Sequence, residues 1–174
     1  MTKKVSVAIL GSTGFVGLEL AGILSKHPNV EIVFVGTESN PNASISDFNN
    51  FIDNRKIPLT KLNKDFDYKK ADTVFLALPH GISNKYVNNF YGKIQIIDLS
   101  ADFRLDNFEI YKNNYGEEHY SPHLLENFIY GLPEFNKKNL HNHKNIAVPG
   151  CYPTSVLIPI IPLLKNKYIL ATDI

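Results

Sequence analysis

The amino-acid sequence predicts an α/β protein built on a doubly wound, mostly parallel β-sheet. The apolar run from Val5 to Leu10 is followed by the turn GSTGFVG, a helical pattern of apolar residues at 15–24 and a β-branched run from Val30 to Val35. This order is a βαβ unit, which crosses over with right-handed chirality and pairs its strands in parallel. The alternation returns at 73–99, where two apolar runs flank an amphipathic stretch.

The later elements are predicted from the same patterns. The sequence TVFLAL at 73–78 and the sequence IQIIDL at 94–99 indicate buried strands, and residues 82–91 between them indicate a helix. The patterns are weaker between 37 and 70, where we expect a loop, then a short helix at 45–52 and a strand at 57–62.

Residues 100–144 are polar, aromatic and irregular, with a helix expected at 107–115. Long irregular segments in compact domains are usually functional. A short strand at 145–148 leads to Cys151, a helix follows at about 154–164, and residues 169–174 indicate a strand without a partner. We therefore expect one complete domain at 1–150 and, at 151–174, the truncated start of a second, α+β catalytic and dimerisation domain.

The composition excludes several classes of partner. The 174 residues carry a net charge of +1, so the chain has no basic surplus for binding nucleic acid. The longest apolar run, 156–164, is interrupted by two prolines and is too short to span a membrane. The single cysteine permits no internal disulfide. We expect a cytoplasmic protein with a small-molecule partner, and neither a nucleic acid nor a membrane as partner.

The turn at 11–17 has the spacing G-x-x-G-x-x-G, a variant of the dinucleotide-binding fingerprint. Glycines between a strand and a helix permit a tight turn and let the backbone approach a pyrophosphate at the helix N-terminus. A glycine-rich turn that binds nothing is the alternative, but the strand before it and the helix after it favour a nucleotide. We therefore predict a Rossmann-type domain whose cofactor-binding residues include Gly11, Ser12, Thr13, Gly14, Val16 and Gly17, with hydroxyl donors from Ser12 and Thr13.

The choice between NAD and NADP is open at the level of the residues. An acidic side chain about 20 residues after the turn favours NAD, and Glu38 is a candidate for that role. Thr37, Ser39 and Asn40 are instead suited to hydrogen bonds with the 2′-phosphate of NADP.

Cys151 lies between the turn dipeptide Pro149-Gly150 and the helix-start residues Pro153 and Thr154. A helix N-terminus stabilises a thiolate, the reactive form of cysteine. A lone cysteine is more often a small buried apolar residue, but this one follows a nucleotide domain. A nucleophilic cysteine combined with a nicotinamide cofactor implies an enzyme that interconverts an aldehyde and an activated acyl group.

Four motifs, GSTGFVGLEL, DLSADFRL, YGLPE and VPGCYPT, occur in the same order in N-acetyl-gamma-glutamyl-phosphate reductases, and the chain closely resembles the first half of this family of arginine-biosynthesis enzymes. The resemblance implies NADPH-dependent reduction of N-acetylglutamyl 5-phosphate to N-acetylglutamate 5-semialdehyde and phosphate, through a cysteine thioacyl intermediate. It implies that Cys151 is the nucleophile and that Arg104, one of only two arginines, holds the substrate phosphate. Leu78, Pro79 and Ser100 are implied to lie beside the cofactor.

The same resemblance implies NADP as the cofactor, although the segment TESN after the second strand lacks an arginine for the 2′-phosphate. It also implies a histidine general acid/base beyond Ile174 and a homo-oligomer, either a dimer or a tetramer, for the full-length protein. One alternative is aspartate-semialdehyde dehydrogenase itself, in which asparagine usually precedes the nucleophile where this chain has Gly150. The other is a nucleotide-binding module that does no chemistry.

The remaining titratable residues give no further site. No group of histidines has zinc-ligand spacing, so we expect no metal site and six histidines at the surface. Asp98 ends a strand and is expected to bond the backbone of the following turn. Asp102 is expected to hold Arg104 in place.

Overall fold

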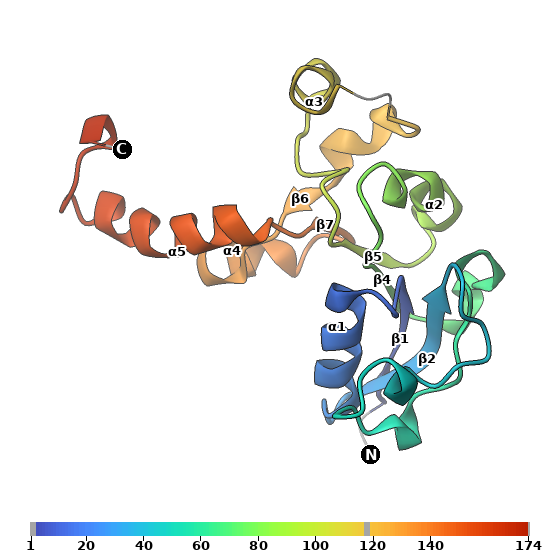
Figure 1. Cartoon of the computed structure of the whole chain (residues 1–174). Coiled ribbons are helices and arrows are strands. Elements are labelled where there is room, and N and C mark those ends of the chain that lie inside the picture. Colours follow the sequence, from blue (N-terminus) through green and yellow to red (C-terminus); the bar gives the residue numbers. More distant parts are fainter. Residues whose placement is uncertain (1–2, 117–118, 174) are drawn as a thin grey trace.

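The computed structural model describes residues 3–116 and 119–173, and these residues form a sheet of seven strands. Every strand pairing is parallel, and the strand order is β3-β2-β1-β4-β5-β7-β6 (Figure 1). The predicted doubly wound α/β class is therefore confirmed. The strands are β1 (Val5–Leu10), β2 (Val30–Thr37), β3 (Lys61–Leu62), β4 (Thr73–Leu76), β5 (Gln95–Asp98), β6 (Ile129–Tyr130) and β7 (Asn145–Ala147).

The strand order reverses direction between β1 and β4. The chain builds outward from β1 through β2 to β3 and then returns to place β4 on the other side of β1, where Leu10 is in register with Leu76. In open α/β sheets, the crevice outside the carboxyl ends of two such strands is where ligands bind. The loops that follow β1 and β4 are therefore the expected place for a ligand.

Helices α1 (Phe15–Ser25) and α2 (Ser83–Phe90) cover the two faces of the sheet. The further helices are α3 (Phe108–Tyr115), α4 (Pro133–Leu140) and α5 (Cys151–Lys165). Figure 1 shows α1 and α2 on opposite sides of the sheet. Alternate residues of β1 serve the two faces, because Ile9 packs in one core with Ala21 of α1 while Leu10 packs in the other with Val87 of α2. Burial on both faces explains why the strands are almost wholly apolar.

Three weakly patterned segments differ from their predictions. The helix expected at 45–52 is only a 3₁₀ turn, Ile45–Asp47, which Ser44 and Asp47 cap reciprocally. The strand expected at 57–62 is reduced to Lys61–Leu62. The strand expected at 169–174 is wrong: Ala171–Asp173 is a 3₁₀ turn, and Ile174 lies outside the described residues. A 3₁₀ turn satisfies its hydrogen bonds locally, whereas a lone strand cannot.

The irregular segment 100–144 holds two elements that the sequence pattern missed. Strand β6 has two residues, too few to show a periodicity, and it is recognised only by its parallel pairing with β7. Helix α4 has a weak apolar pattern and begins at Pro133, a residue suited to a first helical turn.

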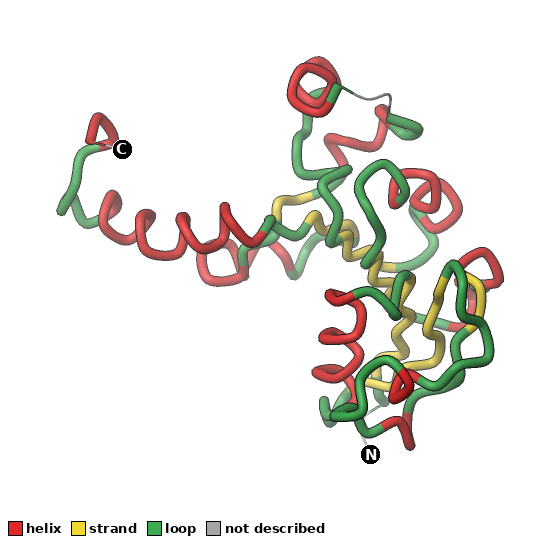
Figure 2. Tube along the Cα trace, in the orientation of Figure 1, coloured by secondary structure: helices red, strands yellow, loops and turns green. Residues whose placement is uncertain are grey.

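Helix α5 extends away from the sheet as an arm (Figures 1 and 2). It begins at Cys151, three residues before the predicted start, and none of its residues is buried. Tyr152 is 83% exposed and Val156 is 49% exposed. Across the described part of the chain, no helix has both the length and the apolar character needed to cross a membrane.

Candidate active site

The glycine turn fastens α1 and β4 to the end of β1. Gly11 has a φ of +80°, and a Cβ built on it would lie 2.2 Å from the carbonyl oxygen of Ala77. A Cβ on Gly17 would lie 2.2 Å from the carbonyl oxygen of Gly11. Neither position tolerates a side chain, because both clashes are with backbone atoms. The first and third glycines are therefore required by the packing of this chain itself.

Gly14 is different, because its own chain does not require a glycine there. A Cβ on Gly14 would meet only the Gly11 carbonyl oxygen, at an ordinary 3.6 Å. Gly14 is the exposed N-cap of α1 and supplies no side-chain cap to the helix, and Val16 in the first turn is also exposed. The space that a Cβ would fill, in front of unpaired first-turn N–H groups, fits the pyrophosphate of a dinucleotide.

The hydroxyl groups of the turn do not all lie where we expected. Ser12 is fully buried, and its hydroxyl donates to the carbonyl oxygen of Gly36 at 2.9 Å, so it braces β2 and does not face outward. The Thr13 hydroxyl lies 3.1 Å from that of Thr37, which is also buried. Ser39 is exposed at the end of β2. Ser39 is therefore the exposed hydroxyl among these residues, whereas Thr13 is half-buried with its hydroxyl against that of Thr37.

Glu38 is held by two residues that the sequence analysis did not identify. Its Oε1 accepts hydrogen bonds from Asn63 Nδ2 at 2.6 Å and from the Tyr86 hydroxyl at 3.2 Å. The Oδ1 atom of Asn63 accepts the Gly11 N–H at 3.1 Å. Burial, followed by the Glu38 carboxylate, raises the pKa of Tyr86, which keeps its hydroxyl a donor. Asn63 thereby ties Glu38, the candidate for the choice between NAD and NADP, to the glycine turn.

The loop after β4 meets the glycine turn. Leu78 is buried, and its Cδ2 lies 3.1 Å from the place where a Gly11 Cβ would be, while Pro79 is exposed. The loops expected to hold the pyrophosphate and to pass the nicotinamide are therefore adjacent at the switch point between β1 and β4.

Arg104 links the loop after β5 to the turn that carries Cys151. Its Nε donates to the Val148 carbonyl oxygen at 2.8 Å, and its Nη2 donates to the Leu99 carbonyl oxygen at 3.0 Å. A Cβ on Gly150 would lie 3.0 Å from Arg104 Nη1. The guanidinium therefore lies directly beside the residue that precedes the cysteine.

Cys151 is the first residue of α5, and its unpaired thiol is exposed. The predicted position at a helix N-terminus is confirmed. Gly150 is the N-cap, and its carbonyl oxygen accepts both the N–H of Thr154, at 3.0 Å, and its hydroxyl, at 2.8 Å. The thiol is thus accessible to a substrate at a point where the helix dipole favours negative charge.

Asp98 organises the turn after β5, as expected. Its Oδ1 accepts the Ser100 N–H at 3.1 Å, and its Oδ2 accepts the Ser100 hydroxyl at 2.8 Å. Burial raises the pKa of Asp98 to about 6, against the opposing effect of these hydrogen bonds. Ser100, predicted to contact the cofactor, is itself buried within this network.

The raised pKa of Asp98 predicts a stability that falls as the pH rises. A carboxyl group with a folded-state pKa of about 6, against an ordinary 3.8, binds its proton more tightly in the folded chain. Its stabilising contribution is complete below the ordinary pKa and is lost as the pH rises through the folded-state pKa, a difference of about 3 kcal/mol. Urea unfolding measures this: from about pH 4 to pH 7 the free energy of unfolding of the wild type should fall relative to that of Asp98→Asn. Parallel pH curves would contradict the assignment.

Asp102 does not hold Arg104, contrary to our expectation. It is fully buried and contacts the loop after β4, where its Oδ1 lies 2.7 Å from His80 Nδ1. His119 is buried as well, and its Nε2 donates to the carbonyl oxygen of Asp102 at 2.9 Å. Burial lowers the pKa of His119, which favours the neutral ring. The expectation that all six histidines lie at the surface is therefore wrong for His119, and His80 is half-buried.

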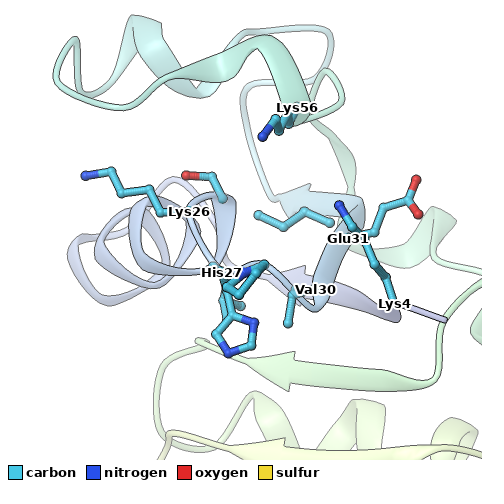
Figure 3. A pocket seen from close by; sticks show the side chains of 10 residues that line it. Lys4, Lys26, His27, Val30, Glu31 and Lys56 are labelled. Carbon is cyan, nitrogen blue, oxygen red and sulfur yellow. The ribbon is translucent and has the colours of Figure 1, made fainter. Parts of the chain in front are cut away.

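Other features of the surface do not add to the site. Within residues 3–116 and 119–173, no group of three or more histidine, cysteine, aspartate or glutamate side chains is placed to hold a metal ion. A hollow of about 520 Å³ lined by Lys4, Lys26, His27, Glu31 and Lys56, among others, lies at the amino ends of β1 and β2, at the edge opposite the candidate site (Figure 3).

Comparison with known proteins assigns the chain to a family. Residues 6–143 match the semialdehyde dehydrogenase NAD-binding domain. An N-acetyl-gamma-glutamyl-phosphate reductase from Ehrlichia canis is 41% identical over 100% of this chain and 50% of its own, and one from Caldicellulosiruptor saccharolyticus is 44% identical over 95% and 48%. The crystal structure of aspartate semialdehyde dehydrogenase with NADP from Candida albicans has a TM-score of 0.64 at 16% identity, over 94% of this chain and 48% of that one.

These relatives confirm the resemblance drawn from the four motifs. The chain spans about half the length of the curated relatives it matches. The similarity to the Candida albicans structure, at its low identity, shows a shared fold. The match to the family over most of the chain shows that this protein belongs to the semialdehyde dehydrogenase NAD-binding domain family.

Proposed function

We propose that this chain is the cofactor-binding and nucleophile-bearing part of an N-acetyl-gamma-glutamyl-phosphate reductase of arginine biosynthesis. The observation that carries the proposal is the position of Arg104 beside the turn that presents Cys151, in a chain 41% identical along its whole length to such a reductase. A guanidinium next to an exposed thiol suits an acyl phosphate, because the thiol can accept the acyl group while the guanidinium binds the phosphate.

In this reaction the Cys151 thiolate attacks the acyl carbon of N-acetylglutamyl 5-phosphate. The sulfur–carbon bond forms as the carbon–oxygen bond to phosphate breaks, which leaves a thioester on Cys151 and releases phosphate beside Arg104. A reduced nicotinamide, when bound, supplies the hydride. Cys151 then leaves as a thiolate when the semialdehyde is released.

The residues at the carboxyl edge of β1, β2, β4 and β5 would hold the cofactor. Gly14 admits the pyrophosphate to the N-terminus of α1, and Gly11 and Gly17 keep the turn tight enough to present it. The other residues proposed for this site are Ser12, Thr13, Val16, Thr37, Ser39, Leu78, Pro79 and Ser100, of which Ser12, Thr37 and Ser100 support it from buried positions. We propose NADP(H) as the cofactor, supported by the similarity to the reductases and opposed by the Glu38 carboxylate that Asn63 and Tyr86 hold at the end of β2.

We also propose that residues 1–150 form the dinucleotide-binding domain and that residues 151–174 begin a second domain. The exposure of the whole apolar helix α5 supports this division, because such a surface is normally covered. We propose further that the whole protein is a cytoplasmic homo-oligomer that acts on a small molecule. Its histidine acid/base would lie in the second domain.

The function is tested by supplying the whole protein with N-acetylglutamyl 5-phosphate and either NADPH or NADH. We expect N-acetylglutamate 5-semialdehyde to form faster with NADPH than with NADH, and none to form in the Cys151→Ser variant. Aspartyl 4-phosphate serves as the competing substrate, and its faster reduction would favour the aspartate-semialdehyde dehydrogenase reaction instead. Faster turnover with NADH would overturn the choice of cofactor.

A further inference from the structure

We infer that Asp102 is a positioning residue that holds the loop after β4 and the loop after β5 in one arrangement. The cofactor and the substrate phosphate are thereby bound in a fixed position relative to each other. The inference rests on the proposed function, because it takes the loop after β4, which carries Leu78 and Pro79, as a cofactor loop and Arg104 as the phosphate ligand. Asp102 itself is fully buried, so it would act on both ligands through the two loops.

The carboxylate of Asp102 caps a helix that lacks a cap of its own. Helix α2 begins at Ser83, and Ile82 before it provides no side-chain hydrogen bond. Asp102 Oδ1 accepts the N–H of Gly81 at 2.7 Å, and Oδ2 accepts the N–H of Asn84 at 2.9 Å. A negative charge at a helix N-terminus also interacts favourably with the helix dipole. The start of α2 is therefore fixed by a residue from another loop.

The same carboxylate fixes His80, which follows Pro79 in the cofactor loop. His80 Nδ1 lies 2.7 Å from Asp102 Oδ1, and the His80 side chain is 29% exposed against 0% for that of Asp102. On its other side, His80 Nε2 lies 3.3 Å from the Tyr111 hydroxyl, and the His80 ring stacks at a tilt on Tyr115 with centroids 4.6 Å apart. The imidazole is thus held between the buried carboxylate and α3.

The backbone of Asp102 is fixed just as firmly to the loop that bears Arg104. Its N–H donates to the Ser100 hydroxyl oxygen at 3.0 Å, and that hydroxyl donates in turn to Asp98. Its carbonyl oxygen accepts His119 Nε2–H, and Arg104 closes the same loop through Leu99. With its main chain on one loop and its carboxylate on the other, Asp102 transmits any shift of the cofactor loop to Arg104.

The charge of Asp102 is needed because three groups converge on its two oxygens. In Asp102→Asn the amide group supplies a single acceptor oxygen, so the N–H of either Gly81 or Asn84 loses its partner, and the charge facing His80 disappears. Loss of a charge-assisted hydrogen bond at a buried site is expected to displace both loops together.

Two probes report the two loops separately. The dissociation constant for NADPH reports the cofactor loop. The ratio of the alkylation rates of Cys151 with iodoacetate and with iodoacetamide reports Arg104, because only the first reagent is an anion that the guanidinium attracts. We expect Asp102→Asn to raise the dissociation constant about tenfold and to lower the rate ratio at least about twofold, toward that of the denatured chain.

Asp72→Asn is the control, because Asp72 also accepts two hydrogen bonds, both from Ser6, but lies at the opposite edge of the sheet. The dissociation constant for NADPH and the ratio of alkylation rates should both be unchanged in this variant. If Asp102→Asn does not fold, His80→Gln carries the test with an expected two- to fivefold loss in both probes. A folded variant that changes one probe without the other, or neither, overturns the inference alone. A wild-type protein that binds neither NADPH nor NADH overturns the proposed function and the inference together.

Discussion

The substitution Gly14→Ala is expected to leave the fold intact and to weaken dinucleotide binding about a hundredfold, equivalent to about 2.8 kcal/mol. The new Cβ would meet only the Gly11 carbonyl oxygen, at 3.6 Å, and the backbone angles of Gly14, φ −79° and ψ 164°, suit alanine. The methyl group would instead occupy the space in which the backbone must approach the pyrophosphate. Calorimetric titration with NADPH, together with urea unfolding, measures the two effects separately.

Two other glycines of the same region provide the controls. Gly22→Ala, within α1, would place its Cβ at an ordinary 3.5 Å from Ile52 Cγ1, so it should change neither binding nor the fold. Gly17→Ala should unfold the turn itself, because its Cβ would lie 2.2 Å from a carbonyl oxygen. Tight binding of NADPH by Gly14→Ala would remove the glycine turn from the cofactor site.

Arg104→Lys is expected to weaken phosphate binding at least about tenfold while changing the affinity for NADPH less than about twofold. Lysine keeps the charge but cannot donate to the Val148 and Leu99 carbonyl oxygens and also face Gly150 with a third nitrogen. The turn that presents Cys151 therefore loses hydrogen bonds that hold it in place, and the phosphate loses its two-point contact with a guanidinium. Calorimetric titration with inorganic phosphate and with NADPH measures both affinities.

The chain offers a natural control in its other arginine. Arg55 is exposed and pairs with the nearby Asp53 at 2.7 Å, so Arg55→Lys should alter neither affinity. If Arg104→Lys lowered the affinity for phosphate and the affinity for NADPH equally, Arg104 would support the whole edge of the sheet and would not serve the phosphate site in particular.

The parts of the site that the sequence predicted are those coded by neighbouring residues. The glycine spacing identified the turn before α1, and Pro149-Gly150 with Pro153 identified a helix that starts near Cys151. Each of these signals lies within a few positions of the feature it creates. The strands were predicted for a similar reason, because residues buried on both faces leave a continuous apolar run.

The parts that could not be predicted depend on contacts between distant residues. Asn63 reaches Glu38 across 25 positions, and Asp102 reaches Gly81 across 21. No local pattern distinguishes these buried polar residues from the solvated polar residues around them. The parallel pairing of β2 with β3 brings Asn63 to Glu38, and that of β4 with β5 brings Asp102 to Gly81. For the same reason the sequence pairs Asp102 with the nearby Arg104, whereas its carboxylate contacts Gly81 and Asn84.

The role of Cys151 is tested most directly by mass spectrometry of the protein after incubation with N-acetylglutamyl 5-phosphate in the absence of NADPH. Without a hydride donor the acyl group should remain on the enzyme, because the thiolate has displaced phosphate and the thioester has no reductant. We expect one N-acetylglutamyl group per chain, located on the peptide that contains Cys151, lost on treatment with hydroxylamine and absent from Cys151→Ser. An unmodified wild-type chain, or the same adduct on the Cys151→Ser variant, would contradict the assignment of Cys151 as the nucleophile.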